Sequence, residues 1–99
     1  WRNNKRNNNR VKWLSNKVNI GVDGYQRATS QDLQISQNIA ETFSTPAGEA
    51  VLKYLRSVTI EMVHGPNVTT EELRHHEGQR YIVGLLERRV SHAHRSKNK

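Results

Sequence analysis

The chain of 99 residues contains no cysteine, which excludes a disulfide framework and a thiolate zinc site. Aromatic residues make up only 6% of the chain and hydrophobic residues 33%, a smaller share than globular domains usually carry. No apolar run approaches the ~18 residues of a membrane helix, so no membrane contact is expected. The composition therefore predicts one small domain whose core is completed by the surface of a partner.

Positive charge is concentrated at the two ends of the sequence, although the net charge of the whole chain is +7. Residues 1–30 carry seven cations and one acid, residues 31–87 carry four cations and eight acids, and residues 88–99 carry five cations and no acid. An acidic centre flanked by two basic arms indicates a partner with negative charge, either a nucleic acid or an acidic protein surface.

The sequence divides into an extended, Asn-rich basic arm and linker (residues 1–29), a helical core (residues 30–90) and a basic tail (residues 91–99). In the first 17 residues, dense positive charge disfavours collapse and asparagine disfavours helix interiors. This arm is therefore expected to take no fixed fold by itself.

The stretch from residue 18 to residue 29 alternates weakly between apolar and polar side chains, and Asp23-Gly24 is a turn signal. A lone hairpin is barely stable in water, however. We therefore interpret this stretch as an extended linker that could add a strand to a partner's sheet.

Three helices are predicted between the arms, which places the chain in the mainly α class, as a small helical domain with a helical hairpin at its centre. Ser30 and Thr45 are N-cap residue types, and Pro46 fits a first helical position because it has no N–H to leave unsatisfied. Thr69 and Glu72 have the spacing of a capping box. The helices are expected at residues 30–43, at residues 46 to about 58, and at residues 70 to about 92.

Apolar positions between residues 43 and 90 recur at intervals of three and four, so the core is predicted there. Glu77 and Arg80 lie three residues apart on one helix, which predicts a local ion pair. Two alternatives for Arg80 are that it caps a loop or that it binds a neighbouring molecule. Gly78 and Gly84 are notches where a neighbouring helix could approach. The predicted buried stripe of the second helix comprises Ala47, Ala50, Val51, Tyr54, Leu55 and Val58.

Two sets of residues are candidates for contacts with partners. Cations neutralise phosphates or carboxylates, and a tryptophan ring offers a stacking face to bases. DNA or RNA contact and docking on a neighbouring subunit both remain open for the first arm. The charged candidates are Arg2, Lys5, Arg6, Arg10, Lys12, Lys17, Arg88, Arg89 and Arg95, and the docking candidates are Trp1, Trp13, Leu14, Tyr54 and Tyr81.

The five histidines lack the spacing of a metal site. His75 and His76 are adjacent, so on a helix they point about 100° apart. His92 and His94 could share an ion only in an extended chain. His76-Glu77 suggests acid–base chemistry, but no nucleophile or oxyanion donor accompanies the pair. We expect neither an enzyme nor a bound metal or cofactor.

Three short motifs carry a resemblance to a known family. They are Phe43-Ser44-Thr45-Pro46-Ala47-Gly48, then Val51-Leu52 with Leu55, then Glu77-Gly78-Gln79-Arg80 with an aliphatic run behind it. Together they resemble a family of small tailed-bacteriophage proteins that are encoded among the head, portal and internal virion genes. The resemblance covers about half of the chain and leaves both basic arms outside it.

The resemblance implies a structural protein of the virion. Its partners would be portal or other virion proteins, in multiple symmetric copies, on a portal or head oligomer or in an internal core, with packaged double-stranded DNA as a further contact. Two alternatives stay open, a free nucleic-acid-binding regulator and a ribonucleoprotein component whose basic arms fold on RNA. The net acidic central helices count against the regulator.

The first arm provides a direct test of nucleic-acid contact. If its cations neutralise phosphates, the 99-residue chain binds double-stranded DNA with an affinity that falls steeply with salt, and deletion of residues 1–17 removes this binding. A titration at several salt concentrations measures the effect. Binding that is weak, or that is independent of the arm, would instead leave the arm as a protein-docking segment.

Overall fold

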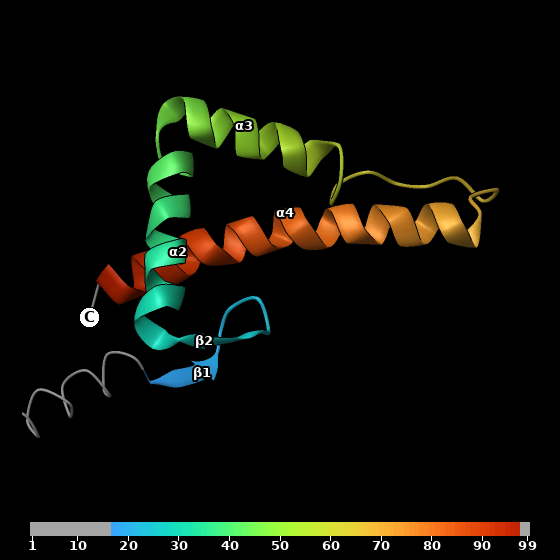
Figure 1. Ribbon diagram of the computed structural model, residues 1–99. Coiled ribbons are helices and arrows are strands. Elements are labelled where there is room, and N and C mark those ends of the chain that lie inside the picture. Colours follow the sequence, from blue (N-terminus) through green and yellow to red (C-terminus); the bar gives the residue numbers. More distant parts are fainter. Residues whose placement is uncertain (1–16, 98–99) are drawn as a thin grey trace, which may run out of the picture.

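A computed structural model describes residues 17–97 of the chain. These residues form a short hairpin followed by three helices, so the mainly α prediction is confirmed (Figure 1). Among them, no helix is long and apolar enough to cross a membrane. The elements in chain order are β1 (Val18–Ile20), β2 (Gln26–Ala28), α2 (Thr29–Phe43), α3 (Pro46–Ser57) and α4 (Thr70–Lys97).

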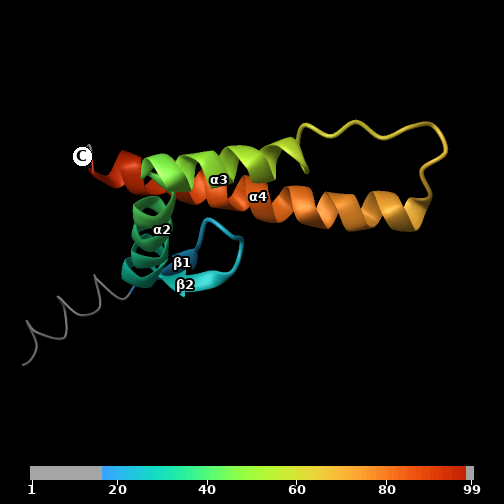
Figure 2. The ribbon, with the colours of Figure 1, turned by 90° about the horizontal axis from the view of Figure 1, so that it is seen from above.

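The long helix α4 forms the axis of the molecule. α2 crosses its carboxyl-terminal half, while α3 runs alongside it in the opposite direction and is joined to it by residues 58–69 (Figures 1 and 2). α3 and α4 are therefore the two arms of the predicted helical hairpin. The β-hairpin lies on the other side of α4 from α3 and next to the start of α2 (Figure 1).

The core lies where α2 crosses α4, and the prediction of a core inside the helical hairpin was wrong. α3 has no buried residue, and its stripe residues Val51 and Tyr54 are 50% and 64% exposed. The reason is that the side of α3 that faces α4 is the one that carries Arg56. The Arg56 Nη1 donates a hydrogen bond to the Glu87 carboxylate of α4 at 2.7 Å. The buried residues are Asp32, Ser36 and Ala40 on α2, and Val83, Arg89 and Ala93 on α4.

Two predicted helix starts are confirmed and one is wrong. The Thr45 hydroxyl accepts the Gly48 N–H at 3.0 Å, and the Thr69 hydroxyl accepts the Glu72 N–H at 3.1 Å. α2, however, begins one residue before Ser30, and its N-cap position has no side-chain hydrogen bond. The physical reason is that β2 runs directly into α2, so that pairing across the hairpin fixes where the helix begins.

The stretch interpreted as an extended linker is a β-hairpin. β1 and β2 pair antiparallel with Val18 opposite Ala28, and Gly24 makes the turn with a φ of +87°, a conformation that glycine adopts without strain. The hairpin is stable here because it is not alone. The Val22 N–H donates to the Asp32 carboxylate of α2 at 3.4 Å, and a Cβ at Gly21 would lie 2.6 Å from the same carboxylate.

The end of α4 differs from its predicted position near His92. The helix continues to Lys97, so most of the predicted basic tail is helical. Tertiary contacts with α2 explain the extension. The His92 Nδ1 lies 2.7 Å from the Ser36 hydroxyl, and Ala93 is buried against α2.

The tight junction between α2 and α3 predicts a strict need for glycine at position 48. A Cβ there would overlap the Thr42 carbonyl oxygen and lie 2.7 Å from the Phe43 Cα. We expect Gly48→Ala to destabilise the fold by about 1–3 kcal/mol, although alanine is the better helix former. Urea unfolding followed by circular dichroism measures this change.

Gly78→Ala is the matched control for this change, because a Cβ at Gly78 would meet nothing within 4 Å. It should stabilise α4 by about 1 kcal/mol. Equal unfolding midpoints for the two variants would contradict the close approach at Gly48.

Candidate functional site

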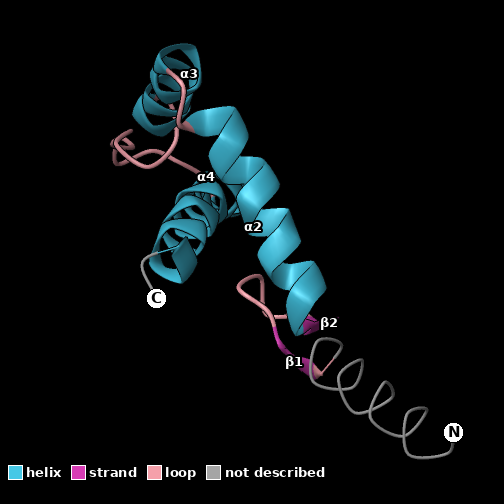
Figure 3. Ribbon diagram, turned by 90° about the vertical axis from the view of Figure 1, so that its left-hand side faces the viewer, coloured by secondary structure: helices cyan, strands magenta, loops and turns pink. Residues whose placement is uncertain are grey.

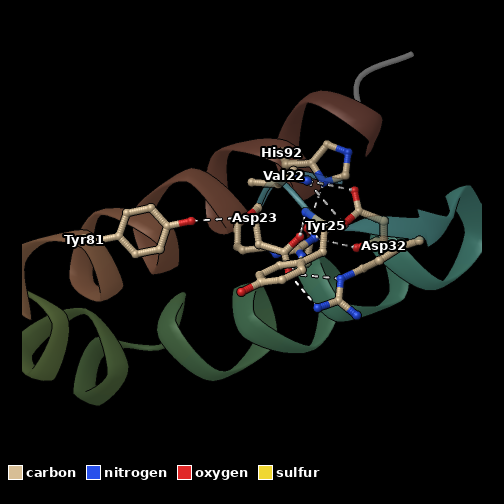
Figure 4. A network of polar contacts seen from close by, with 9 residues as sticks. Val22, Asp23, Tyr25, Asp32, Tyr81 and His92 are labelled. Carbon is tan, nitrogen blue, oxygen red and sulfur yellow. Dashed lines mark hydrogen bonds and ion pairs between the residues drawn. The ribbon is translucent and has the colours of Figure 1, made fainter. Parts of the chain in front are cut away.

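The buried centre of the molecule is a network of charged and polar side chains from three elements (Figure 4). Arg89 of α4 is only 2% exposed. Its Nη1 donates to the Asp32 carboxylate at 2.6 Å, to the Asp32 carbonyl oxygen at 2.9 Å and to the Ser36 hydroxyl at 3.0 Å. Its Nη2 lies 3.6 Å from the Asp23 carboxylate in the hairpin turn.

The hairpin side of this network is closed by further polar contacts. The Arg27 Nη2 lies 2.6 Å from the Asp23 carboxylate, and the Tyr81 hydroxyl donates to the Asp23 carbonyl oxygen at 3.1 Å. The hydrogen bond from Arg27 lowers the pKa of the Asp23 carboxyl below its ordinary value, with a smaller effect from the Tyr25 N–H. Two arginines thus face two aspartates, which is the arrangement of a structural ion-pair cluster.

Arg89 had been predicted to contact a nucleic acid or an acidic surface, and that prediction was wrong. Its guanidinium is enclosed between α2, α4 and the hairpin, where no external partner reaches it. The sequence contains a weak sign of this role in the spacing of Asp32 and Ser36, which lie four residues apart and on one side of α2. The spacing of Asp32 and Ser36 predicts a buried ion pair only if a cation on another helix is known to face them.

A second polar cluster holds the chain between α3 and α4. The Arg80 Nε donates to the Thr59 carbonyl oxygen at 3.0 Å, and its Nη2 donates to the Met62 carbonyl oxygen at 2.5 Å. Arg80 also pairs with Glu77 at 3.0 Å. The local ion pair and the loop-capping role are thus both present, and this explains the Glu77–Arg80 motif as a structural one.

An exposed apolar surface follows one side of α3. We call it the α3 stripe and define it as Ala47, Ala50, Val51, Tyr54 and Val58. All of these side chains are exposed, and Val58 has a smaller exposed fraction than Val51 and Tyr54. The stripe contains no charged residue. An uncharged apolar stripe of this kind is suited to contact with another protein surface.

Of the remaining predicted contact residues, Tyr81, Arg88 and Arg95 lie on one side of α4, whereas Lys17 lies just before β1. Arg88, Arg95 and Lys17 are exposed, and the Arg88 guanidinium lies 5.6 Å from the centre of the Tyr81 ring. Tyr81 itself is half exposed. The other predicted residues of the first arm lie outside the described residues: Arg2, Lys5, Arg6, Arg10, Lys12, Trp1, Trp13 and Leu14.

Three of the five histidines lie close together, whereas His92 and His94 lie next to Ser36 and Ser44. The rings of His64 and His76 have centroids 4.2 Å apart, and His75 stands next to them. Within residues 17–97, no group of three or more potential ligands is placed to hold a metal ion.

Most of the helical part of the chain matches a family of phage proteins. A family model described as Bbp19-like phage protein matches residues 39–97. No curated protein and no solved structure matches the chain. The matched range covers more than half of the chain and includes all of α3 and α4, whereas the β-hairpin and most of α2 lie before it.

The buried Arg89 is expected to be the most sensitive single position for stability. Arg89→Met removes the charge and leaves the Asp32 carboxylate buried without its partner, so we expect a loss of about 3–5 kcal/mol in unfolding free energy. Arg95→Met changes an exposed arginine of the same helix and should stay within about 0.5 kcal/mol. Urea denaturation measures both, and equal midpoints would argue against a central role for the Arg89 network.

Proposed function

Because the chain belongs to the family of Bbp19-like phage proteins, we propose that it is a structural component of a tailed-phage virion. In this proposal it docks on a portal or head oligomer, or on an internal core of the particle. It acts by binding and carries out no catalytic step.

The α3 stripe is the observation that carries the proposal. A helix with apolar residues at intervals of three and four normally buries them, yet Val51 and Tyr54 remain at least half exposed. Covering side chains of this size stabilises a complex by roughly 1.5–3 kcal/mol each. A protein partner therefore accounts for a surface that the chain itself leaves uncovered.

Small individual contacts suffice if the partner is a symmetric oligomer. Several copies bound around one ring reinforce one another through the assembly, so each copy needs only a modest interface. The burial pattern favours the same proposal, since a small apolar core and exposed apolar side chains suit a subunit that is stabilised on a larger neighbour.

The basic ends of the chain supply a second contact within the same proposal. Arg88 and Arg95 are exposed on the carboxyl-terminal half of α4, and the first arm adds further cations. In the particle these charges would lie along packaged DNA or an acidic face of a neighbouring subunit. A free nucleic-acid-binding regulator is less well supported, because the α3 stripe has no role in it.

Incorporation into phage particles tests the α3 stripe. We expect Tyr54→Ser to leave the fold intact, since Tyr54 is 64% exposed, but to lower the copy number in purified particles by about tenfold, because docking loses apolar contact. Quantitative mass spectrometry of purified particles measures the copy number, and circular dichroism of the isolated variant checks the fold.

Lys53→Ser is the matched control, because Lys53 is exposed on the same helix but outside the α3 stripe. It should be incorporated like the unmodified chain. Full incorporation of the Tyr54→Ser variant would exclude the α3 stripe as the docking surface. Absence of the unmodified chain from particles would exclude a virion role altogether.

A further inference from the structure

One side of α4 is left uncovered along most of the helix. Figure 3, which looks along α4 from its carboxyl-terminal end, shows α2, α3 and the hairpin around only part of its circumference. Residues that alternate at intervals of four and three lie on one side of a helix. We call the uncovered side the free face and define it as Glu77, Tyr81, Gly84, Arg88, Ser91 and Arg95. All except the half-buried Gly84 are exposed.

The glycine at the middle of the free face has no explanation within the chain. A Cβ at Gly84 would meet nothing within 4 Å, so close internal packing does not require a glycine there. A glycine inside a helix also costs about 1 kcal/mol relative to alanine. Gly84 therefore leaves a shallow notch on the surface of α4, open toward whatever packs on the free face.

The charges of the free face are incompletely matched within the chain. Arg88 forms no ion pair with a carboxylate of the described residues and lies instead over the Tyr81 ring. Glu77 pairs with Arg80, yet its side chain is 61% exposed. The helix dipole does not account for either residue, because its effect is confined to the first and last turns and both residues lie further inside α4.

The order of these residues is self-complementary. Glu77 and Tyr81 are four residues apart, and so are Gly84 and Arg88. If a second α4 runs in the opposite direction around a two-fold axis between residues 82 and 83, Glu77 stands opposite Arg88 and Tyr81 stands opposite Gly84. The first of these contacts joins an acid to a base, and the second places a large ring against the notch at Gly84. Two-fold symmetry produces two copies of each contact.

We propose that a second copy of this chain packs antiparallel on the free face of α4. The dimer contains two Glu77–Arg88 ion pairs between the copies, and each Tyr81 ring fills the notch at Gly84 of the other copy. The Tyr81 hydroxyl bond to the Asp23 carbonyl oxygen fixes the ring in advance, which reduces the entropy lost on association. In the dimer Arg88 pairs with Glu77 of the other copy, so the proposed contact with DNA or an acidic surface is left to Arg95 and the first arm.

The dimer leaves the α3 stripe available, so it is compatible with docking on a larger virion protein but does not depend on it. Its test uses the isolated 99-residue chain, whereas the docking test uses particles. Failure of one therefore does not imply failure of the other.

Charge reversal tests the two ion pairs. E77R and R88E each place like charges opposite one another at both symmetric positions, so each should weaken the dimer by at least about tenfold in sedimentation equilibrium. The double variant E77R/R88E restores both pairs with reversed polarity and should dimerise like the unmodified chain. An equimolar mixture of the two single variants should also dimerise, because the heterodimer again pairs acid with base at both positions.

Two matched controls make the same charge changes away from the free face. E49R and K53E alter exposed residues of α3 and should leave the dimer unchanged. Circular dichroism confirms that each variant is folded, which matters because Glu77 also contacts Arg80. A monomer at millimolar concentration, a dimer insensitive to both single reversals, or a folded double variant that stays monomeric would each overturn the proposal.

Disulfide cross-linking tests whether the two α4 helices of the dimer run antiparallel. The chain has no cysteine, so single cysteines can be introduced without background disulfides. When Glu77→Cys and Arg88→Cys variants are mixed and oxidised, the antiparallel arrangement predicts the mixed disulfide between them. A parallel arrangement would instead give disulfides between identical variants and would overturn the proposed geometry.

Discussion

Arg89 lies where α2, α4 and the β-hairpin meet, and its charge must be matched there because almost none of its surface reaches water. Asp32 supplies that match from α2 and Asp23 supplies it from the hairpin turn. These two contacts join α2 and the hairpin turn to the same guanidinium of α4. A buried arginine of this kind favours a single arrangement, since displacement of either neighbouring element leaves a charge without a partner.

A charged centre leaves little apolar surface to bury. The buried apolar residues of the described chain are Ala40, Val83 and Ala93, which are small or medium in size. Larger apolar side chains remain at the surface of α3 and α4 instead. The same constraint therefore connects the fold with the proposed function. The ion-pair cluster fills the crossing point, and apolar side chains of α3 stay exposed, where the proposed docking on a virion protein would cover them.

Local signals in the sequence identified the three helices of the described residues, but not the pairing of β1 with β2. Thr45 and Pro46 predicted the start of α3, and Thr69 predicted the start of α4, because a capping bond joins groups only three residues apart. The same signals were misleading where a distant contact intervenes. Ser30 is a good capping residue, but α2 begins before it because the hairpin leads directly into the helix. Similarly, α4 ends later than predicted, because contacts with α2 stabilise its last turns.

The sequence by itself determined the number of helices within residues 17–97, most of the boundaries of these helices, and the division of the chain into an acidic centre with basic ends. Only the tertiary structure decided which helix faces are buried. Periodicity shows that α3 has an apolar side, but not whether the chain covers it, because that depends on where Arg56 and Arg80 attach α3 to α4. Similarly, composition counts Arg89 as one more cation. Its partner Asp32 is 57 residues away, and a pairing over that distance leaves no local pattern to read.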